Sequence, residues 1–250
     1  PSLCLHYQEL QFSYYKECFS SFCWQQIFLP ITDLNSGVLK MVIFGIDLVL
    51  LIPALMISAT PVLLAAIGEA VVEKSGVLNL GVEGMMITGA VIGFIFAVNT
   101  EIPIYGFICA AIAGALLSVL FAVLTQYIMS NQVATGLGLT MVGLGLSALI
   151  GKPYEGIRSP TLSKIEIPIL SDIPILGPMI FSHDAIVYFS IILVGTVAFV
   201  ISKTRVGLVL RAVGENQEAA HALGYKVVRI RFLAIMFGGA TAGIGGAYIS

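Results

Sequence analysis

Long apolar runs separated by short polar breaks fill the chain from residue 41 onward. Each run is close to the roughly 18–20 residues that an α-helix needs to cross the hydrocarbon core of a bilayer. The pattern therefore predicts an all-α protein, a polytopic transmembrane bundle with about six spans. The predicted helices cover residues 42–67, 77–98, 104–128, 133–150, 184–201 and 232–250.

The two ends of the chain depart from this pattern. Residues 1–40 hold three of the four cysteines and the only tryptophan, and they contain no spanning run. Because the sequence from Met41 looks like a natural start, we expect residues 1–40 to be an upstream extension, either non-native or the result of a mis-called start, and 41–250 to be one transmembrane domain. The last apolar run continues to Ser250 without a polar flank, so we expect this domain to be truncated and further helices in the full protein.

Charge fixes the orientation of the predicted helices. Half of the twelve basic residues fall in residues 202–231, and loops rich in Lys and Arg face the cytoplasm. The proline-rich stretch 151–178 then forms part of an external loop, for which we predict short extended or interfacial pieces. The basic residues that set the orientation are Lys203, Arg205, Arg211, Lys226, Arg229 and Arg231.

The composition fits a membrane protein and excludes several other classes. Hydrophobic residues make up 58% of the chain and charged residues 10%, against roughly 45–50% and about 25% in soluble domains. The lipid bilayer is therefore the first predicted partner. No basic block is long enough to track phosphates, so nucleic acid is not a predicted partner. The histidines and cysteines lack the spacing of metal ligands, so no metal site is predicted.

The stretch "SGVLNLGVEG" interrupts the apolar pattern at residues 75–84. Gly76, Gly81 and Gly84 weaken a continuous helix there. Non-helical backbone at membrane depth is tolerated only where it is buried in protein or lines a wet cavity. Polar residues at that depth are functional candidates by default, so Asn79 and Glu83 are predicted to lie on a substrate pathway.

A second interpretation of this region stays open. Residues 68–76 could form a short cytoplasmic turn that leaves Glu69, Glu73 and Lys74 in water. Such a turn explains Asn79 and Glu83 poorly, because both lie beyond it in the next apolar run. For these two residues, the alternatives are a pathway role and a packing role.

The stretch "RAVGENQEAAHALGYKVVRIR", residues 211–231, predicts a short amphipathic helix inside the basic loop. Either Glu215 or Asn216 caps the helix "QEAAHAL", and Gly224 ends it. Ala219, Ala220 and Leu223 are predicted to share one face. A capped helix between two spans is typical of a permease that docks a partner and transmits its motion.

Closely spaced glycines predict tight contacts between helices. Gly89 with Gly93, and Gly239 with Gly243, let helix backbones approach each other in lipid. Ordinary helix packing accounts for both pairs, and no further function is placed on them.

Three segments together resemble a known family. They are "GEAVVEKSGVLNLGVEGMM", "NQVATGLGLTMVGLGLS" and "LRAVGENQEAAHALGYKVVRIRFLAIMFGGATAGIGGAY". In this order they are similar to the permease subunits of bacterial ABC importers, in the superfamily of ribose and branched-chain amino acid permeases. The segment "EKSGVLNLGVEG" is most similar to the simple-sugar and nucleoside permeases.

The resemblance implies a permease, not an enzyme, that moves a nucleoside or a simple sugar across the bacterial cytoplasmic (inner) membrane. It implies partners: ATP-binding cassette subunits, a second homologous permease and an extracytoplasmic solute-binding protein. ATP would be bound by a partner, since the chain lacks a GxxxxGK[ST] run and no cofactor of its own is expected. The region 76–84 matches the family's segment near the translocation path. The residues that match the ATPase-coupling loop are Gly214, Glu215, Asn216, Ala219, Ala220 and Gly224.

Two other classes of function were weighed. An ion-gradient-driven secondary transporter or channel usually places acids or histidines within its spans. Here only Asp47, Glu83 and a few residues near helix ends qualify. A membrane-embedded enzyme needs a nucleophile–base pair or a metal constellation, and the sequence offers neither.

Overall fold

The computed structural model describes residues 42–43, 46–159, 164–166 and 182–250, and the expectation for residues 1–40 lies outside them. Six of the helices described are long and apolar enough to cross a membrane, which confirms the predicted all-α bundle. They are α2 (Leu48–Lys74), α3 (Val82–Thr100), α4 (Pro103–Gln126), α5 (Gln132–Gly151), α7 (Ala185–Lys203) and α10 (Val227–Ile249).

The remaining elements are short. The 3-10 helix η1 (Lys152–Tyr154) follows α5, and the helices α8 (Arg205–Glu215) and α9 (Gln217–Ala222) link α7 to α10. Two antiparallel strand pairs join β1 (Val42–Ile43) to β2 (Ile46–Asp47) and β3 (Lys164–Glu166) to β4 (Ser182–Asp184). The pairing of β3 confirms an extended piece within the predicted external loop.

Helix α8 was not predicted from the sequence. It starts at Thr204, whose hydroxyl oxygen accepts the Gly207 N–H at 3.3 Å, as an N-cap residue does. Gly207, Leu210 and Val213 are buried, three residues apart, which is the spacing of one helix face. The basic loop is therefore mostly helical, and Arg205 and Glu215 of α8 are exposed.

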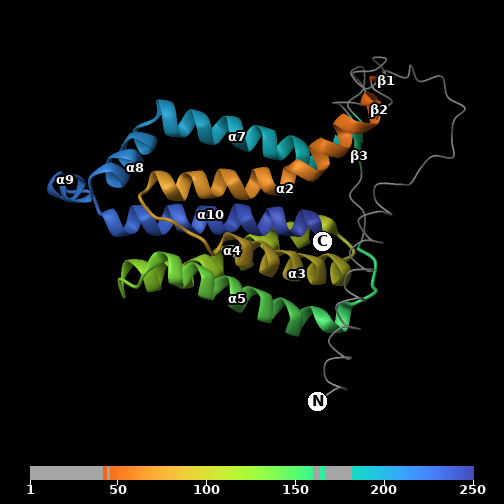
Figure 1. The fold of residues 1–250 in the computed structure, drawn as a ribbon, viewed down its shortest axis with the longest axis horizontal. Coiled ribbons are helices and arrows are strands. Elements are labelled where there is room, and N and C mark those ends of the chain that lie inside the picture. Colours follow the sequence, from red (N-terminus) through yellow and green to blue (C-terminus); the bar gives the residue numbers. More distant parts are fainter. Residues whose placement is uncertain (1–41, 44–45, 160–163, 167–181) are drawn as a thin grey trace, which may run out of the picture.

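Helix α10 lies at the centre of the bundle, in contact with α2, α3 and α4 (Figure 1). Half of the residues in the membrane-length apolar stretch of α10 are buried, compared with 17% in the corresponding stretches of α5 and α7. Helix α5 packs beside α3, and α7 packs beside α2. Helices α8 and α9 extend from one end of the bundle, and β3 and η1 lie at the opposite end (Figure 1).

Glycines hold α10 tightly against its neighbours. A Cβ atom on Gly89 of α3 would lie 2.5 Å from the Cα atom of Gly243 in α10. A Cβ atom on Gly239 would lie 2.6 Å from the carbonyl oxygen of Gly114 in α4. Both predicted glycine pairs are therefore helix contacts, as expected. Because apolar burial gives little driving force between helices in lipid, close backbone packing stabilises this core.

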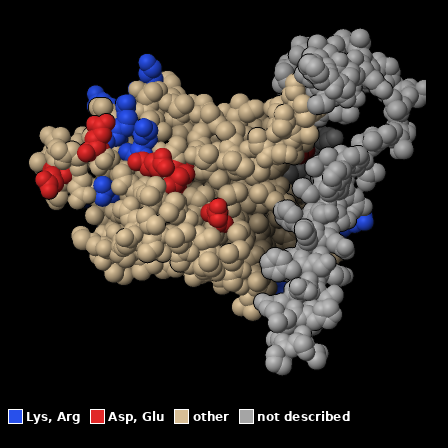
Figure 2. Space-filling model, in the orientation of Figure 1, with Lys and Arg blue, Asp and Glu red and all other residues tan. Residues whose placement is uncertain are grey.

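The sides of the bundle are apolar, and one end of it is charged. Large apolar side chains are exposed along α4, α5 and α7, for example Leu116, Leu149 and Ile192. Most charged side chains in Figure 2 gather where α8 and α9 extend from the bundle. Residues 127–131 and 204–226 lie at that same end, and η1, at the start of the predicted external loop, lies at the opposite end (Figure 1).

Candidate functional site

The glycines of residues 75–84 do break the helix, and the helix before them ends later than the predicted residue 67. Helix α2 continues through Lys74, so the interpretation of residues 68–76 as a turn is wrong for residues 68–74. Gly76 then takes φ = +80°, a left-handed conformation that glycine adopts without steric cost. Residues 75–81, named the break from here on, run back along the bundle, so α3 begins deeper inside it than α5 or α10 (Figure 1).

Side chains of the neighbouring helices satisfy the backbone of the break. Without regular structure, its N–H and C=O groups need other partners at membrane depth. The bonds join the Leu78 N–H to Gln132 Oε1 (2.9 Å), the Asn79 N–H to Glu69 Oε1 (3.0 Å) and the Thr140 hydroxyl to the Leu80 carbonyl (3.3 Å). Helices α2 and α5 therefore hold the break from two sides.

Asn79 lies inside the protein, just before the N-terminus of α3. Its side chain is only 2% exposed, and its Oδ1 atom accepts the N–H of Gly81 at 3.0 Å. Its Nδ2 group donates to the sulfur of Met85 at 3.6 Å. The amide thus fixes the entry of the chain into α3. Its predicted place on a substrate pathway stays a prediction.

Glu83 is exposed and stands in the first turn of α3. A carboxylate there is favoured by the positive end of the helix dipole. The residue lines a hollow of about 280 Å³ between α3 and α10, and the other lining residues are uncharged. They are Met86, Ile87, Ala90, Gly246 and Ile249. Glu83 therefore places a hydrogen-bond acceptor at the edge of an otherwise apolar surface.

The three glycines of this region allow close backbone contacts. A Cβ atom on Gly84 would lie 2.7 Å from the Cα atom of Thr140 in α5. A Cβ atom on Gly81 would lie 3.3 Å from the carbonyl oxygen of Gly136, also in α5. Gly76 contacts a different element, α8, as described below. These glycines therefore allow the break to pack closely against α5 and α8, and they contribute no polar side chain to the region.

The short capped helix predicted within the basic loop is confirmed as α9; the role of this loop in coupling stays a prediction. Asn216 rather than Glu215 caps it, because Asn216 Oδ1 accepts the Ala219 N–H at 3.0 Å. Gly224 follows the helix at φ = +86°, the conformation of a C-terminal glycine cap. Glu215 ends the preceding helix α8 and is exposed.

The faces of α9 differ from the prediction. Ala220 is 1% exposed and packs with Val213 and Val227, whereas Ala219 and Leu223 are exposed. The prediction that all three share one face is wrong for Ala220, because adjacent residues of an α-helix point about 100° apart. Ala220 anchors α9 to α8 and α10, and Leu223, 75% exposed, stands on the free side.

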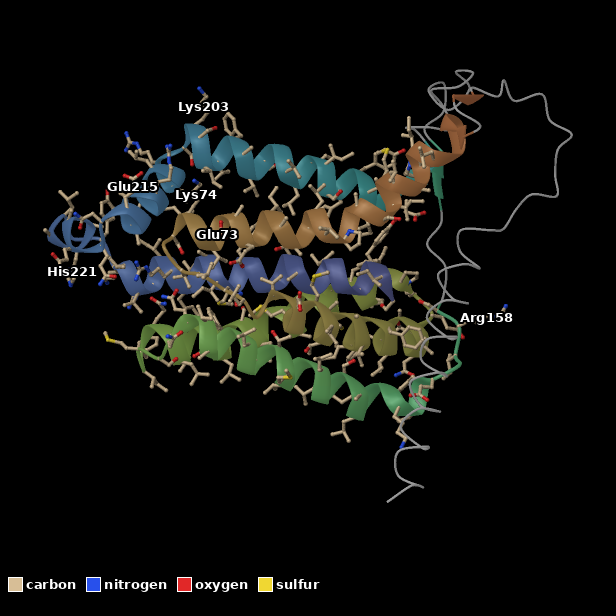
Figure 3. The ribbon with its side chains drawn as sticks, viewed as in Figure 1. Glu73, Lys74, Arg158, Lys203, Glu215 and His221 are labelled. Atoms are coloured by element: carbon tan, nitrogen blue, oxygen red, sulfur yellow. The ribbon has the colours of Figure 1, made fainter. Side chains whose placement is uncertain are left out.

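The break and the coupling loop, predicted separately, meet in the structure. A Cβ atom on Gly76 would lie 3.0 Å from the Cα atom of Gly214. Arg231 of α10 lies at the same place, with its Nε group donating to the Ser75 carbonyl at 3.1 Å. In Figure 3, Glu73 and Lys74 at the end of α2 lie at the same end of the bundle as Glu215, and Arg158 lies at the opposite end.

Three residues that shape this region are not among the site residues predicted from the sequence: Glu69, Gln132 and Arg231. One of the two interpretations of residues 68–76 places Glu69 in a solvent-exposed turn, and Arg231 is predicted only as part of the basic loop. Both are charges within apolar spans, and the cost of placing charge there is the signal that could have found them. Gln132 carried no comparable signal, because a polar residue at a helix start is ordinary.

A family model described as "Branched-chain amino acid transport system / permease component" matches residues 51–250. The chain is 36% identical to a putative glucose ABC transporter permease protein of Haloferax volcanii over 77% of this chain and 60% of that protein. It is 34% identical to a guanosine ABC transporter permease protein of Bacillus subtilis over 79% of this chain and 66% of that protein.

A nucleoside ABC transporter permease protein of Lactococcus lactis is 30% identical over 79% of this chain and 66% of its own length. The chain thus spans less than two thirds of the length of these relatives. No solved structure matches the chain. The family match and the six span-length helices lead to one conclusion: the chain belongs to the branched-chain amino acid transport system permease family and is a multi-pass membrane protein.

Proposed function

We propose that the chain is the permease subunit of an ABC importer that carries a nucleoside or a simple sugar across the cytoplasmic membrane. The observation that carries this proposal is the capped helix α9, held at one end of the bundle next to α8, whose Gly214 touches the break beside α3. The family match supports it, as do relatives named for glucose, guanosine and nucleosides.

The free side of α9 is the proposed docking surface for an ATP-binding cassette subunit. Leu223 is 75% exposed and Tyr225 is 41% exposed, and both follow the basic helix α8 beyond the ends of the spans. Apolar side chains exposed to water mark surfaces that bind protein. A short helix that presents such residues fits a groove on a partner. In this proposal Ala220, Asn216 and Gly224 hold the helix in shape.

The proposed solute pathway follows the break and the first turns of α3. Sugars and the ribose of nucleosides carry hydroxyl groups, and a carboxylate such as that of Glu83 accepts hydrogen bonds from them. The apolar side chains around it would contact the faces of a sugar ring or a base. A second homologous permease would close this surface, and a solute-binding protein would deliver cargo at the end opposite α9.

The chain itself would perform no chemical step in this mechanism. ATP would be bound and hydrolysed by the cassette subunits, and their closure would push α9 toward the bundle. The helices would then alternate between states open to each side. The proposed location is the cytoplasmic membrane, with α8 and α9 facing the cytoplasm, because the basic residues of α8 and of the start of α10 lie at that end and such residues face inward.

The first test is to purify the full-length protein from its native membranes in mild detergent and to identify co-purifying proteins by mass spectrometry. Recovery of an ATP-binding subunit, a second permease and a solute-binding protein would support the proposal. The chain recovered alone, while a known transporter complex survives the same detergent, would contradict it. Uptake that persists without ATP and stops with an ionophore would then favour the ion-gradient alternative.

The docking surface is tested by a matched pair of variants. We expect Leu223→Asp to abolish recovery of the ATP-binding subunit, because a charge would enter an apolar contact. Ile157→Asp is the control, since Ile157 is 46% exposed and follows η1 at the opposite end of the bundle. Equal recovery of the subunit with both variants would refute the assignment of Leu223.

A further inference from the structure

Four parts of the chain meet at one point, here named the joint and defined by Ser75, Gly76, Gly214, Gln217 and Arg231. They belong to the break, the end of α8, the start of α9 and the second turn of α10. A methyl group on Gly214 would overlap the carbonyl oxygen of Lys74, at the end of α2. The backbones of α2 and α8 therefore touch with no side chain between them.

Arg231 connects the two sides of the joint. Its Nε group donates to the Ser75 carbonyl at 3.1 Å, and its Nη1 group donates to Gln217 Oε1 at 2.8 Å. Ser75 itself is fully buried, and its hydroxyl donates to the Val72 carbonyl at 2.6 Å. Hydrogen bonds from a charged guanidinium are stronger than neutral ones, and its planar fork fixes their directions.

A contact of this kind leaves little freedom for one backbone to move without the other. Side chains between two helices can change rotamer and absorb a small shift, whereas touching backbones move together. Gln217 is the first residue of α9, and it accepts a hydrogen bond from Arg231. A movement of α9 would therefore act on Arg231 and on Gly214 of the adjoining α8, and through their contacts with Ser75 and Gly76 on the break that leads into α3.

We infer that the joint couples movement of α9 to the break beside α3, with Arg231 as the positioning residue that keeps the two in register. This role rests on the proposed function, because it needs a cassette subunit to move α9. This positioning role is additional to the one predicted for Arg231 from the sequence, which is only to contribute to the positive charge of the loop. The proposed docking residues Leu223 and Tyr225 are not bonded to Arg231 among the contacts described, so docking and coupling can be tested separately.

The experiment uses the full-length permease assembled with its ATP-binding subunits and solute-binding protein in proteoliposomes. Uptake of radiolabelled guanosine or glucose and release of phosphate are measured together, and their ratio is compared between variants. Arg231→Met removes both hydrogen bonds while keeping a long apolar stem. Arg229→Met is the matched control, because Arg229 lies two residues away on the same helix and is exposed.

We expect Arg231→Met to retain the ATP-binding subunits and to lower uptake per ATP by about tenfold, the scale of losing hydrogen bonds from a charged donor. Arg231→Lys, which keeps the charge but not the fork, should restore part of the ratio. Gln217→Met removes only the hydrogen bond between Arg231 and α9, so it should lower the ratio of uptake to ATP hydrolysis less than Arg231→Met does. It is also the test variant if Arg231→Met fails to assemble with its partners.

An unchanged ratio in Arg231→Met, or in Gln217→Met where Arg231→Met fails to assemble, would overturn this inference. So would loss of the ATP-binding subunits from both variants, since Arg231 would then only hold the shape of the docking surface. An equal fall in Arg229→Met would likewise refute it, because the effect would come from lost positive charge. If wild-type protein binds no ATP-binding subunit, the proposed function fails first, and the failure is recognisable before any variant is compared.

Discussion

Replacing Asn79 by leucine tests how much the break depends on one buried amide. The variant leaves the buried Gly81 N–H without its acceptor, which costs about 1–3 kcal/mol. The leucine side chain recovers part of this, because no amide has to be buried, so we expect a net loss of about 1–2 kcal/mol in the free energy of unfolding. A loss of this size is too small to prevent insertion of a helical bundle.

The assay is thermal unfolding of the detergent-purified full-length protein, together with solute uptake. At about 2–4 °C per kcal/mol, the midpoint should fall by about 2–8 °C. Uptake should fall as well, because the N-terminus of α3 is no longer fixed. Asn79→Ser keeps an oxygen that accepts the Gly81 N–H, so we expect it to lie closer to wild type in both measurements. Wild-type stability of Asn79→Leu would refute this reasoning.

Three further predictions follow from the contacts described. Gly246→Val should lower the melting temperature strongly, since a methyl group there overlaps the Met86 carbonyl and overpacking costs about 1–3 kcal/mol; Gly138→Val, at a position with open space, should have little effect. Ala220→Asp should expose the coupling loop to limited proteolysis, while Ala219→Asp should leave the digestion pattern unchanged and weaken only recovery of the ATP-binding subunit. Glu83→Gln, which keeps an acceptor oxygen, should retain more uptake than Glu83→Leu, and equal uptake by the two would argue against a polar contact with solute.

Local signals in the sequence were enough for the spans and for α9. Apolar runs of membrane length do not depend on distant neighbours, and the cap of α9 is formed by Asn216 with Ala219, three residues away. The joint could not be found in this way. Arg231 reaches a carbonyl 156 residues earlier in the chain, and only the packing of α10 beside α2 brings the two together.

The same reason explains the misplacement of Ala220 and Glu69. An alanine on a short helix has no preference for either face, so the burial of Ala220 depends on Val213 and Val227 from two other helices. The interpretation that places Glu69 in a turn follows from the fact that charge usually marks the end of a span. Its Oε1 atom instead accepts the Asn79 N–H, a partner that exists only once the break has folded back along the bundle.

The glycines of α10 also limit which substitutions this helix can accept during evolution. Any side chain at Gly239, Gly243 or Gly246 would overlap or press on the backbone of α3 or α4, so substitutions there demand simultaneous change in a second helix. Leu233, on the same helix, is 65% exposed and needs only to remain apolar toward lipid. Sequences of related permeases are therefore expected to vary along the lipid side of α10 and to keep its glycine positions small.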